Sequence, residues 1–241
     1  MRSSPFQKTA LAFAMVAGSN APAAQLNDTG VRYCRIQGEV RQQCLATGQD
    51  AEFGRDVTSP ADSNGKAGFS FVKVCNNGQD AGTGSCPADP ELGSGASKWG
   101  CTKDKVTGLT WELKFDAAGP HNAAAQFTNL AADAPGHGGP TDAQGFVNQI
   151  NATGLCGAAD WRLPNVHEML SIVLYGRKYP GPAIDRAYFR KPESGDGYAE
   201  WTSERYAGDP AQAWLVWFDD GGAFNVASDE KHYVRLVRNS K

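Results

Sequence analysis

Six cysteines are the feature of this sequence that most constrains its fold. They lie at Cys34, Cys44, Cys75, Cys86, Cys101 and Cys156. No C-x-x-C pair occurs among them, so a zinc ribbon or a thioredoxin-type redox site has little support. An even number of cysteines without such a motif is typical of a protein that folds in an oxidising compartment and forms disulfides.

The pairing of these cysteines is open at the level of sequence, because six cysteines can combine in many ways. Closure of short loops favours two local bonds and leaves a third to tie the C-terminal region together: Cys34–Cys44, Cys75–Cys86 and Cys101–Cys156. In the chain-entropy treatment, the third and longest loop would contribute about 4 kcal/mol to stability.

Residues 1–24 have the order of features found in a secretory signal peptide. A positive start with Arg2 and Lys8 is followed by a short apolar core at 10–18 and by small residues for cleavage at 21–24. The core is too short to span a bilayer, and no later stretch has the roughly 18 apolar residues that a membrane-spanning helix needs. We therefore expect an exported protein, whether periplasmic, on the cell surface or extracellular.

The charge of the exported chain argues against a nucleic-acid partner. Without residues 1–24, the 23 Lys and Arg residues become 21, against 26 Asp and Glu residues, which leaves a net charge of about −5. A mildly acidic chain has no overall attraction to nucleic acid or to an anionic membrane. Within the chain, Arg162, Arg235 and Arg238 are expected to form internal ion pairs or to bond the backbone, with Asp160 and Glu200 as candidate partners.

Residues 25–98 are rich in glycine, aspartate, asparagine and serine and contain few periodic apolar segments, which is typical of loops. One strand is predicted at 67–75, with Phe69 and Phe71 as packing residues. Because the segment has too few apolar residues for a large core of its own, we expect it to be pinned by disulfides. It should lie against the domain formed by residues 99–241.

Two helices are predicted in residues 99–241. The first runs from an N-cap at Thr141 to a glycine stop at Gly154. The second begins at the N-cap Asn165, with a glutamate three positions later, and continues to Gly176.

Strands are predicted on both sides of these helices, at 105–113, 200–204, 212–218 and 232–238. We expect the first strand to pair with the last, because a compact domain brings its two ends together. Since helices do not alternate with strands, the pattern predicts an α+β fold with an antiparallel sheet and long loops.

Five segments, taken in order, resemble one known family. They are CTKDKVTGLTWELK (101–114), GLCGAADWRLPNVHEMLSIVLYG (154–176), PAIDRAYF (182–189), EWTSERYAGDPAQAWLVWFDDGG (200–222) and HYVRLVR (232–238). Together they resemble the C-terminal domain of the Legionella collagen-like adhesin and its large family of exported bacterial proteins. The resemblance covers residues 99–241 and is specific when the segments are taken together.

The resemblance implies a C-type-lectin-like fold and a function in binding. The expected protein is a secreted or cell-surface, adhesin-like module without catalysis. It would recognise a glycan, such as an anionic polysaccharide, or another protein. This chain lacks the Gly-X-Y repeats of a collagen stalk, so the trimer that such a stalk imposes is not implied.

Two other functions stay open. One is a structural or accessory subunit of an envelope or fibre assembly. The other is an enzyme of the formylglycine-generating kind, which has a related fold and relies on reactive cysteines. Free thiols in the folded protein would favour the enzyme, and their absence would argue against it.

No motif in the sequence predicts a catalytic or metal site. There is no G-x-S-x-G nucleophile elbow, no H-E-x-x-H pair and no phosphate-binding glycine loop before a helix. Asp219 and Asp220 precede two glycines between apolar runs, which is typical of a hairpin corner and not of a calcium site with many oxygen ligands. We therefore expect no cofactor and no metal ion.

The residues predicted to contact a ligand come from two places. A basic and aromatic loop contains Arg177, Lys178, Tyr188, Arg190 and Lys191. Guanidinium groups pair well with sulfate or carboxylate, although a solvated loop with packed aromatic residues is the alternative. On the strand at 212–218, Trp217 stacks on a sugar if its face is exposed and belongs to the core if that face is buried.

Overall fold

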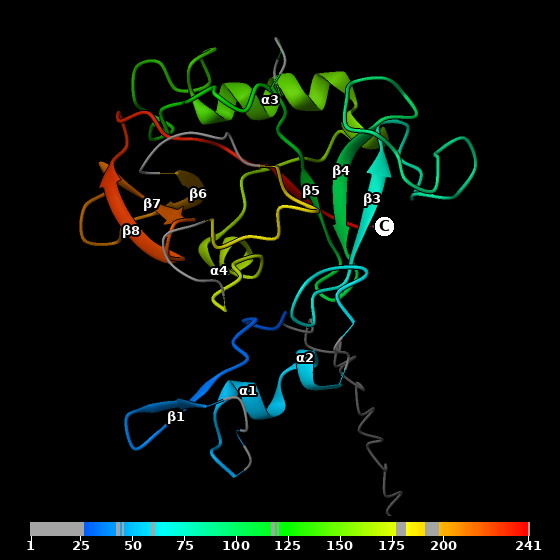
Figure 1. The fold of residues 1–241 in the computed structure, drawn as a ribbon. Coiled ribbons are helices and arrows are strands. Elements are labelled where there is room, and N and C mark those ends of the chain that lie inside the picture. Colours follow the sequence, from blue (N-terminus) through cyan, green and yellow to red (C-terminus); the bar gives the residue numbers. More distant parts are fainter. Residues whose placement is uncertain are drawn as a thin grey trace, which may run out of the picture.

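The computed structural model describes residues 27–41, 44, 46–58, 61–116, 119, 121–176, 182–190 and 198–240 of the 241-residue chain. The expected signal peptide therefore lies outside the described residues. Within them, three antiparallel sheets and a few helices form an α+β fold, as the sequence predicts (Figure 1). The longest helix, α3 (Ala143–Thr153), lies across one end of the two larger sheets, and α4 (Val166–Leu170) lies between them (Figure 1).

The larger sheet has four strands in the order β3-β4-β5-β9. They are β3 (Phe71–Cys75), β4 (Trp99–Asp104), β5 (Leu109–Glu112) and β9 (Val237–Asn239). In the pair β5–β9, Thr110 lies opposite Arg238, which confirms that the first predicted strand of the C-terminal region pairs with the last. The edge strand β3 comes from the loop-rich segment, so this sheet joins the two parts of the chain.

The second sheet has three strands in consecutive order, namely β6 (Ala199–Arg205), β7 (Gln212–Trp217) and β8 (Gly222–Ala227). The central strand β7 is the apolar strand predicted at 212–218. β8 is not among the predicted strands, because its sequence GAFNVA contains glycine, alanine and asparagine, which have low strand propensity. Its strand conformation comes from pairing with β7 along its whole length.

The segment predicted as one strand at 232–238 is divided between the two larger sheets. In its first part, the Tyr233 N–H donates to the Ala199 carbonyl at 3.0 Å, so the chain runs along β6. Its last part is β9. One crossing segment therefore fixes the position of the two sheets relative to each other.

α3 begins one residue later than predicted. Its N-cap is Asp142 and not Thr141, and the Asp142 carboxylate accepts the Gln144 N–H at 3.2 Å. The same carboxylate accepts the Leu130 N–H at 2.9 Å. A carboxylate satisfies several donors at once, so Asp142 caps the helix and also holds the loop before it. The predicted stop at Gly154 is confirmed, with φ at 67°.

α4 has the predicted start but not the predicted end. Asn165 Oδ1 accepts the Glu168 N–H at 2.7 Å, and Glu168 Oε2 accepts the Asn165 N–H at 2.9 Å, which forms a capping box. The prediction that this helix continues to Gly176 is wrong. The chain leaves the helix because its backbone bonds to other segments; the Leu174 N–H, for example, donates to the Ala183 carbonyl at 2.8 Å.

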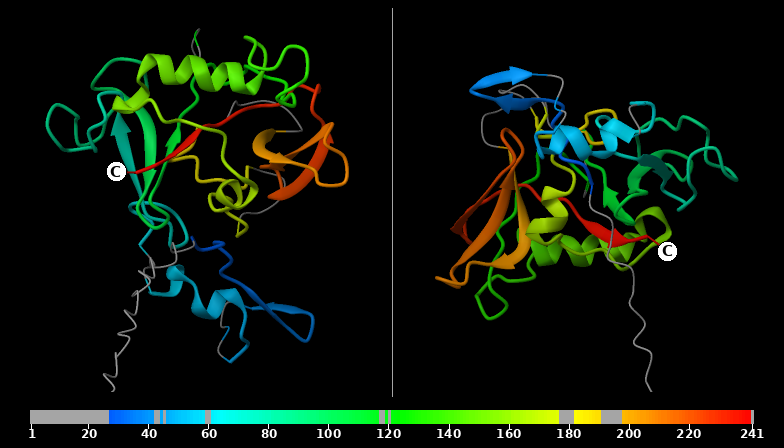
Figure 2. Two further views of the ribbon diagram at one scale, coloured as in Figure 1. Left: turned by 180° about the vertical axis from the view of Figure 1, so that it is seen from behind. Right: turned by 90° about the horizontal axis from the view of Figure 1, so that it is seen from below.

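The first described residues form a small lobe beside the two larger sheets (Figure 2). Its elements are β1 (Cys34–Ile36), β2 (Glu39–Arg41), α1 (Asp50–Phe53) and α2 (Arg55–Thr58). The Asn27 amide donates to the Ser171 carbonyl at 3.0 Å, and the Thr29 carbonyl accepts the Tyr175 N–H at 2.8 Å. These bonds hold the lobe against the C-terminal region.

Two clusters of buried apolar side chains form the core. The first combines the four-stranded sheet with α4 and includes Trp111, Met169 and Phe189. The second contains the buried face of α3 and includes Phe146 and Trp201. The two larger sheets and α3 therefore pack around two adjoining clusters of buried apolar side chains.

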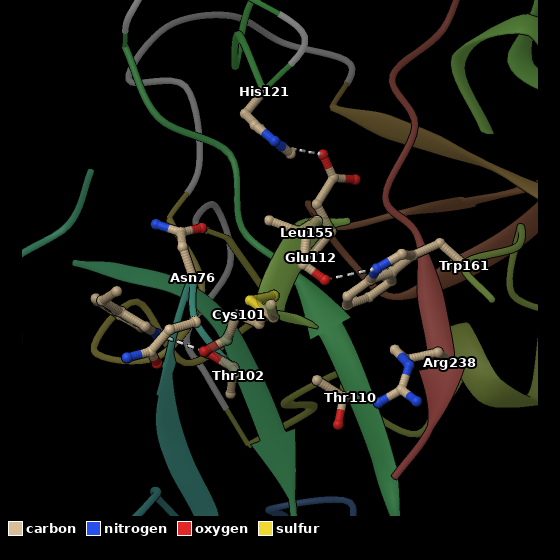
Figure 3. The surroundings of a disulfide bond; sticks show 12 residues. Asn76, Cys101, Thr102, Thr110, Glu112, His121, Leu155, Trp161 and Arg238 are labelled. Carbon is tan, nitrogen blue, oxygen red and sulfur yellow. Dashed lines mark hydrogen bonds and ion pairs between the residues drawn. A yellow bond between two sulfur atoms is a disulfide. The ribbon is translucent and has the colours of Figure 1, made fainter. Parts of the chain in front are cut away.

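All six cysteines form disulfides, in the three pairs that loop length favours: Cys34–Cys44, Cys75–Cys86 and Cys101–Cys156. The third bond links β4 to the short 3-10 helix η1 (Leu155–Gly157), where the Trp161 indole N–H also donates to the Leu155 carbonyl at 3.1 Å (Figure 3). Because no cysteine is free, an enzyme of the formylglycine-generating kind loses the thiols on which it would depend.

Candidate ligand-binding groove

A wide groove with a volume of about 770 Å³ lies between α3 and the end of the β6–β7 hairpin. Its other walls come from the loops at 129–137 and 161–165. We call this hollow the α3 groove; its polar lining includes Asn129, His137, Gln144, Asn148, Arg162 and Arg205. The size is in the range of grooves that bind small molecules and short oligomers.

Two amide side chains on α3 line the groove and are exposed to solvent. Gln144 and Asn148 lie one helical turn apart, and Gln144 Nε2 donates to Asn148 Oδ1 at 3.0 Å. This bond uses one donor hydrogen and one lone pair, which leaves other donors and acceptors of both amides available. Convergent amides of this kind suit a ligand that is rich in hydroxyl groups.

The floor of the groove is held in place by Asn151 and Trp161. Asn151 Oδ1 accepts the Trp161 N–H at 2.8 Å, and Asn151 Nδ2 donates to the Trp161 carbonyl at 2.9 Å. One amide thus satisfies both backbone groups of a residue in an extended segment, where no helix or ladder would satisfy them. Trp161 is only 2% exposed, so its ring packs in the core and does not offer a stacking surface.

Two arginines order the rim of the groove. Arg162 donates to both carboxylate oxygens of Glu168, at 2.7 and 2.6 Å. Burial acts to raise the pKa of Glu168, but the hydrogen bonds from Arg162 hold this pKa below its ordinary value. Arg205 donates to the backbone carbonyls of Asn129 and Leu130, and its charge also interacts with the buried Asp142 carboxylate.

Among the described residues that line the α3 groove, none is an aspartate or a glutamate. Acidic residues nevertheless outnumber Lys and Arg in the whole chain by 26 to 23. His137 also lines the groove, and its Nδ1 lies 3.1 Å from the Leu130 carbonyl oxygen. The lining therefore favours neutral or anionic ligands over cationic ones.

A separate group of charged residues is buried between the two larger sheets and closed to solvent. Arg235 bonds Glu200 through Nε at 3.0 Å and through a terminal nitrogen at 2.8 Å, so one of the expected arginines pairs with one of the candidate acids. The Tyr198 hydroxyl donates to Glu200 at 2.5 Å, and burial, followed by the Glu200 charge, raises the pKa of Tyr198 well above its ordinary value. Arg238 pairs with Asp160, the other candidate acid, near the surface.

A second buried ion pair lies at the end of β5 and contacts α3. Lys114 Nζ and His121 Nδ1 lie 2.7 and 2.9 Å from the same Glu112 oxygen, and Figure 3 shows the contact with His121. Burial lowers the pKa of Lys114, whose ammonium also lies 3.9 Å from the centre of the Phe146 ring. Glu112 and Lys114 have almost no exposed surface, so this cluster connects elements of the fold and does not meet a ligand.

The basic loop predicted to bind a ligand is described only in part. Arg177, Lys178 and Lys191 lie outside the described residues. Arg190 is exposed, as a ligand contact requires. Tyr188 is half-buried: its ring lies 5.4 Å from that of Phe71 and its backbone carbonyl accepts the Thr102 hydroxyl at 2.7 Å, which favours the packed alternative for this residue.

The β7–β8 corner has the predicted hairpin geometry and leaves Trp217 exposed. Asp220 Oδ1 accepts the Gly222 N–H at 2.8 Å, and Gly221 adopts a φ of 81°, which favours glycine. Trp217 is 36% exposed, lies outside the α3 groove and donates its indole N–H to Asp219 at 2.8 Å. Both aspartates thus stabilise the corner, and the described residues contain no group of three or more His, Cys, Asp or Glu side chains arranged to bind a metal.

Sequence reasoning did not find the α3 groove. The signal that could have found it is the pair Gln144 and Asn148, which lie at positions i and i+4 on a polar face of α3 beside its apolar stripe. That signal is weak because exposed amides are common on helices, and only the neighbouring loops turn this helix face into the wall of a hollow.

One comparison with known proteins places the chain in a family. A family model described as the Lcl C-terminal domain matches residues 100–238, and that family is not a known enzyme family. No curated protein and no solved structure matches this chain with significance. In the described part of the chain, no helix has both the length and the apolar character that crossing a bilayer requires. The family and the disulfides together indicate an exported protein.

Proposed function

The chain belongs to the Lcl C-terminal domain family, and from this premise we propose that it is an exported, non-catalytic module that binds a glycan in the α3 groove. The observation that carries the proposal is the lining of that groove: two exposed amides and a positively charged arginine, with no carboxylate among the described lining residues. A hydroxyl-rich chain, neutral or anionic, is the ligand that best matches these groups. Arg190, which is exposed, is a further proposed contact for an anionic chain.

We also propose that the C-terminal region has a C-type-lectin-like fold, with residues 99–241 as its extent. Three features support this: two helices, a sheet closed by the pairing of β5 with β9, and long connecting loops. Glycan binding in this fold would not need calcium here, because Asp219 and Asp220 are used in the hairpin corner.

The proposed location follows from the leader-like residues 1–24 and the three disulfides. We propose that residues 1–24 are removed on export and that the protein acts in the periplasm, on the cell surface or outside the cell. The segment at 25–98 would then contribute β3 to the fold and the disulfide-pinned lobe to the surface.

The test is a glycan screen on the exported chain, followed by calorimetry with the neutral and sulfated oligosaccharides that bind. Replacing Asn148 by alanine removes hydrogen bonds from the groove and is expected to weaken binding about fivefold. Gln149→Ala is the matched control, since Gln149 is also exposed on the same helix but does not line the groove.

A second variant tests the charge preference. Asn148→Asp puts a carboxylate into the groove, so it is expected to weaken a sulfated oligosaccharide more than a neutral one. The proposal fails if no glycan binds, or if Asn148→Ala and Gln149→Ala have the same effect.

A further inference from the structure

Among the described residues, no strand lies beside the outer side of β8, which is therefore a sheet edge. The sheet order is β6-β7-β8, so β7 occupies only one side of β8. On the other side, the described residues supply no backbone hydrogen bond to β8 except the Glu230 N–H, which donates to the Ala227 carbonyl at the end of the strand. An edge of this kind presents unpaired N–H and C=O groups that another strand can bind.

The edge also lacks the features with which proteins usually block such pairing. Its sequence GAFNVA contains no charged residue and no proline. All six residues of β8 pair with β7 in a regular register, whereas the β3–β4 and β6–β7 pairs each contain an irregularity. β8 is therefore an uncharged edge without a bulge, and it could accept an added strand along its whole length.

Two exposed aromatic residues lie next to this edge. Phe224 is 45% exposed, and its ring packs edge to face against that of Trp217, with the ring centres 6.0 Å apart. Phe224 lies opposite Leu215 in the pairing of β7 with β8, so Phe224 and Trp217 share one face of the sheet. An apolar side chain of an added strand would pack beside Phe224 on that face.

Acidic residues flank the edge at both ends. Asp220 precedes β8, and Asp229 and Glu230 follow it, all three of them exposed. Lys231 is the one basic residue between positions 218 and 231. The surface thus has an uncharged, partly aromatic middle between two acidic ends.

We propose that β8 is a docking edge for an extended peptide segment of another protein, with apolar residues in its middle and basic residues at its ends. The peptide would add a fourth antiparallel or parallel strand to the sheet through backbone bonds, pack an apolar side chain beside Phe224, and pair its basic ends with the flanking acids. This surface shares no residue with the α3 groove, so the proposal goes beyond glycan binding.

A second copy of this chain is a poorer occupant. Two β8 strands paired antiparallel about Asn225 would bring Asp220 of one copy opposite Glu230 of the other. Like charges that face each other across a strand pair are destabilising. A basic-ended peptide avoids this repulsion.

The probe is a fluorescently labelled peptide of alternating valine and threonine residues, with two lysines at each end. Binding to the exported chain is measured by fluorescence anisotropy at low and at physiological salt. Two matched peptides are compared with it, one with glutamates in place of the lysines and one with methylated backbone nitrogens. We expect both to bind at least about tenfold more weakly, and the lysine peptide to lose affinity as salt rises.

Two variants locate the site. Phe224→Ala removes the aromatic contact and Ala227→Lys places a positive charge on the edge, and each is expected to weaken the lysine peptide about tenfold. Phe53→Ala is the control, because Phe53 is 72% exposed and lies in the N-terminal lobe. Hydrogen exchange of the amides at 222–227 should slow when the peptide binds.

The proposal is overturned if the three peptides bind equally, if Phe224→Ala and Phe53→Ala have the same effect, or if exchange at 222–227 does not change. It is also overturned if β8 proves to be covered by a second copy, seen as a dimer that Ala227→Lys dissociates. Asn148→Ala should leave peptide binding unchanged, so failure of the groove proposal and failure of this one give different results.

Discussion

At the scale of single residues, the charges that matter most to this fold are the ones with the least access to water. Arg235 and Glu200 are both 0% exposed, and each is satisfied by the other and by neighbouring groups. Arg238 and Asp160 form the same kind of pair, but the Asp160 side chain is 52% exposed. We therefore expect burial, and not the chemistry of the pair, to decide how much each ion pair contributes to the free energy of unfolding.

We expect Glu200→Gln to lower the free energy of unfolding by about 3 kcal/mol, because it removes the carboxylate that the buried Arg235 guanidinium bonds directly. The matched change Asp160→Asn should cost less than about 1 kcal/mol, since solvent screens the exposed pair. Urea unfolding of both variants without reductant measures the difference. Equal losses would mean that burial of the Glu200–Arg235 pair has no energetic consequence.

At the scale of an element, the start of α4 joins helix capping to the rim of the α3 groove. Glu168 bonds the Asn165 N–H in the capping box and both terminal nitrogens of Arg162. The helix itself has only five residues, so its stability depends on these end contacts and on tertiary packing more than on helix propensity.

Stability that depends on Glu168 should disappear at acidic pH. The pKa of Glu168 in the folded protein lies below its ordinary value of 4.5 because Arg162 and Asn165 favour the carboxylate more than burial disfavours it. For a lowered pKa, the contribution is present above the ordinary value and is lost as pH falls through the folded-state value. The free energy of unfolding, measured between about pH 6 and pH 3, should therefore depend less on pH for Glu168→Gln than for the unmodified chain.

Glu230→Gln is the control, because Glu230 is exposed and lies outside the helices. If the pH profile of Glu168→Gln runs parallel to that of the unmodified chain, the role assigned to Glu168 is wrong.

At the scale of the whole molecule, the three disulfides have different ranges of effect. Cys34–Cys44 closes a separation of 10 residues within the N-terminal lobe, whereas Cys101–Cys156 spans 55 residues and ties β4 to η1. All six tryptophans lie at or after position 99, outside the lobe. Tryptophan fluorescence therefore reports on the sheets and α3 without a signal from the lobe.

Replacing Cys101 and Cys156 together by serine is expected to lower the free energy of unfolding by about 4 kcal/mol in the chain-entropy treatment. The double change at Cys34 and Cys44 should leave the midpoint of the fluorescence transition nearly unchanged, because it loosens only the lobe. Urea unfolding followed by tryptophan fluorescence compares the two. If the lobe variant shifts the midpoint as much as the other, the lobe and the sheets unfold as one unit.

Features that depend on short stretches of chain were determined by the sequence itself. The capping box of Asn165, the glycine stop at Gly154 and the corner at Asp219–Gly221 follow from side-chain chemistry within a few residues. The α+β class and the three disulfide pairs also agree with the sequence, because pattern and loop length carry that information. The family followed from segments that were recognisable in order.

Only the tertiary structure decided features that depend on what another part of the chain covers. Alternation along β7 places Trp217 on one face, but the packing around that face decides that Trp217 is exposed while Trp161 is buried. α4 ends at Leu170 because groups distant in the sequence, such as the Ala183 carbonyl, bond the backbone that follows it, and β8 is a strand because pairing with β7 overrides its low strand propensity. The α3 groove exists because loops from 129–137 and 161–165 approach one face of α3. A sequence specifies which groups can make such contacts, whereas the free energy that selects among them depends on the surface that the whole chain buries.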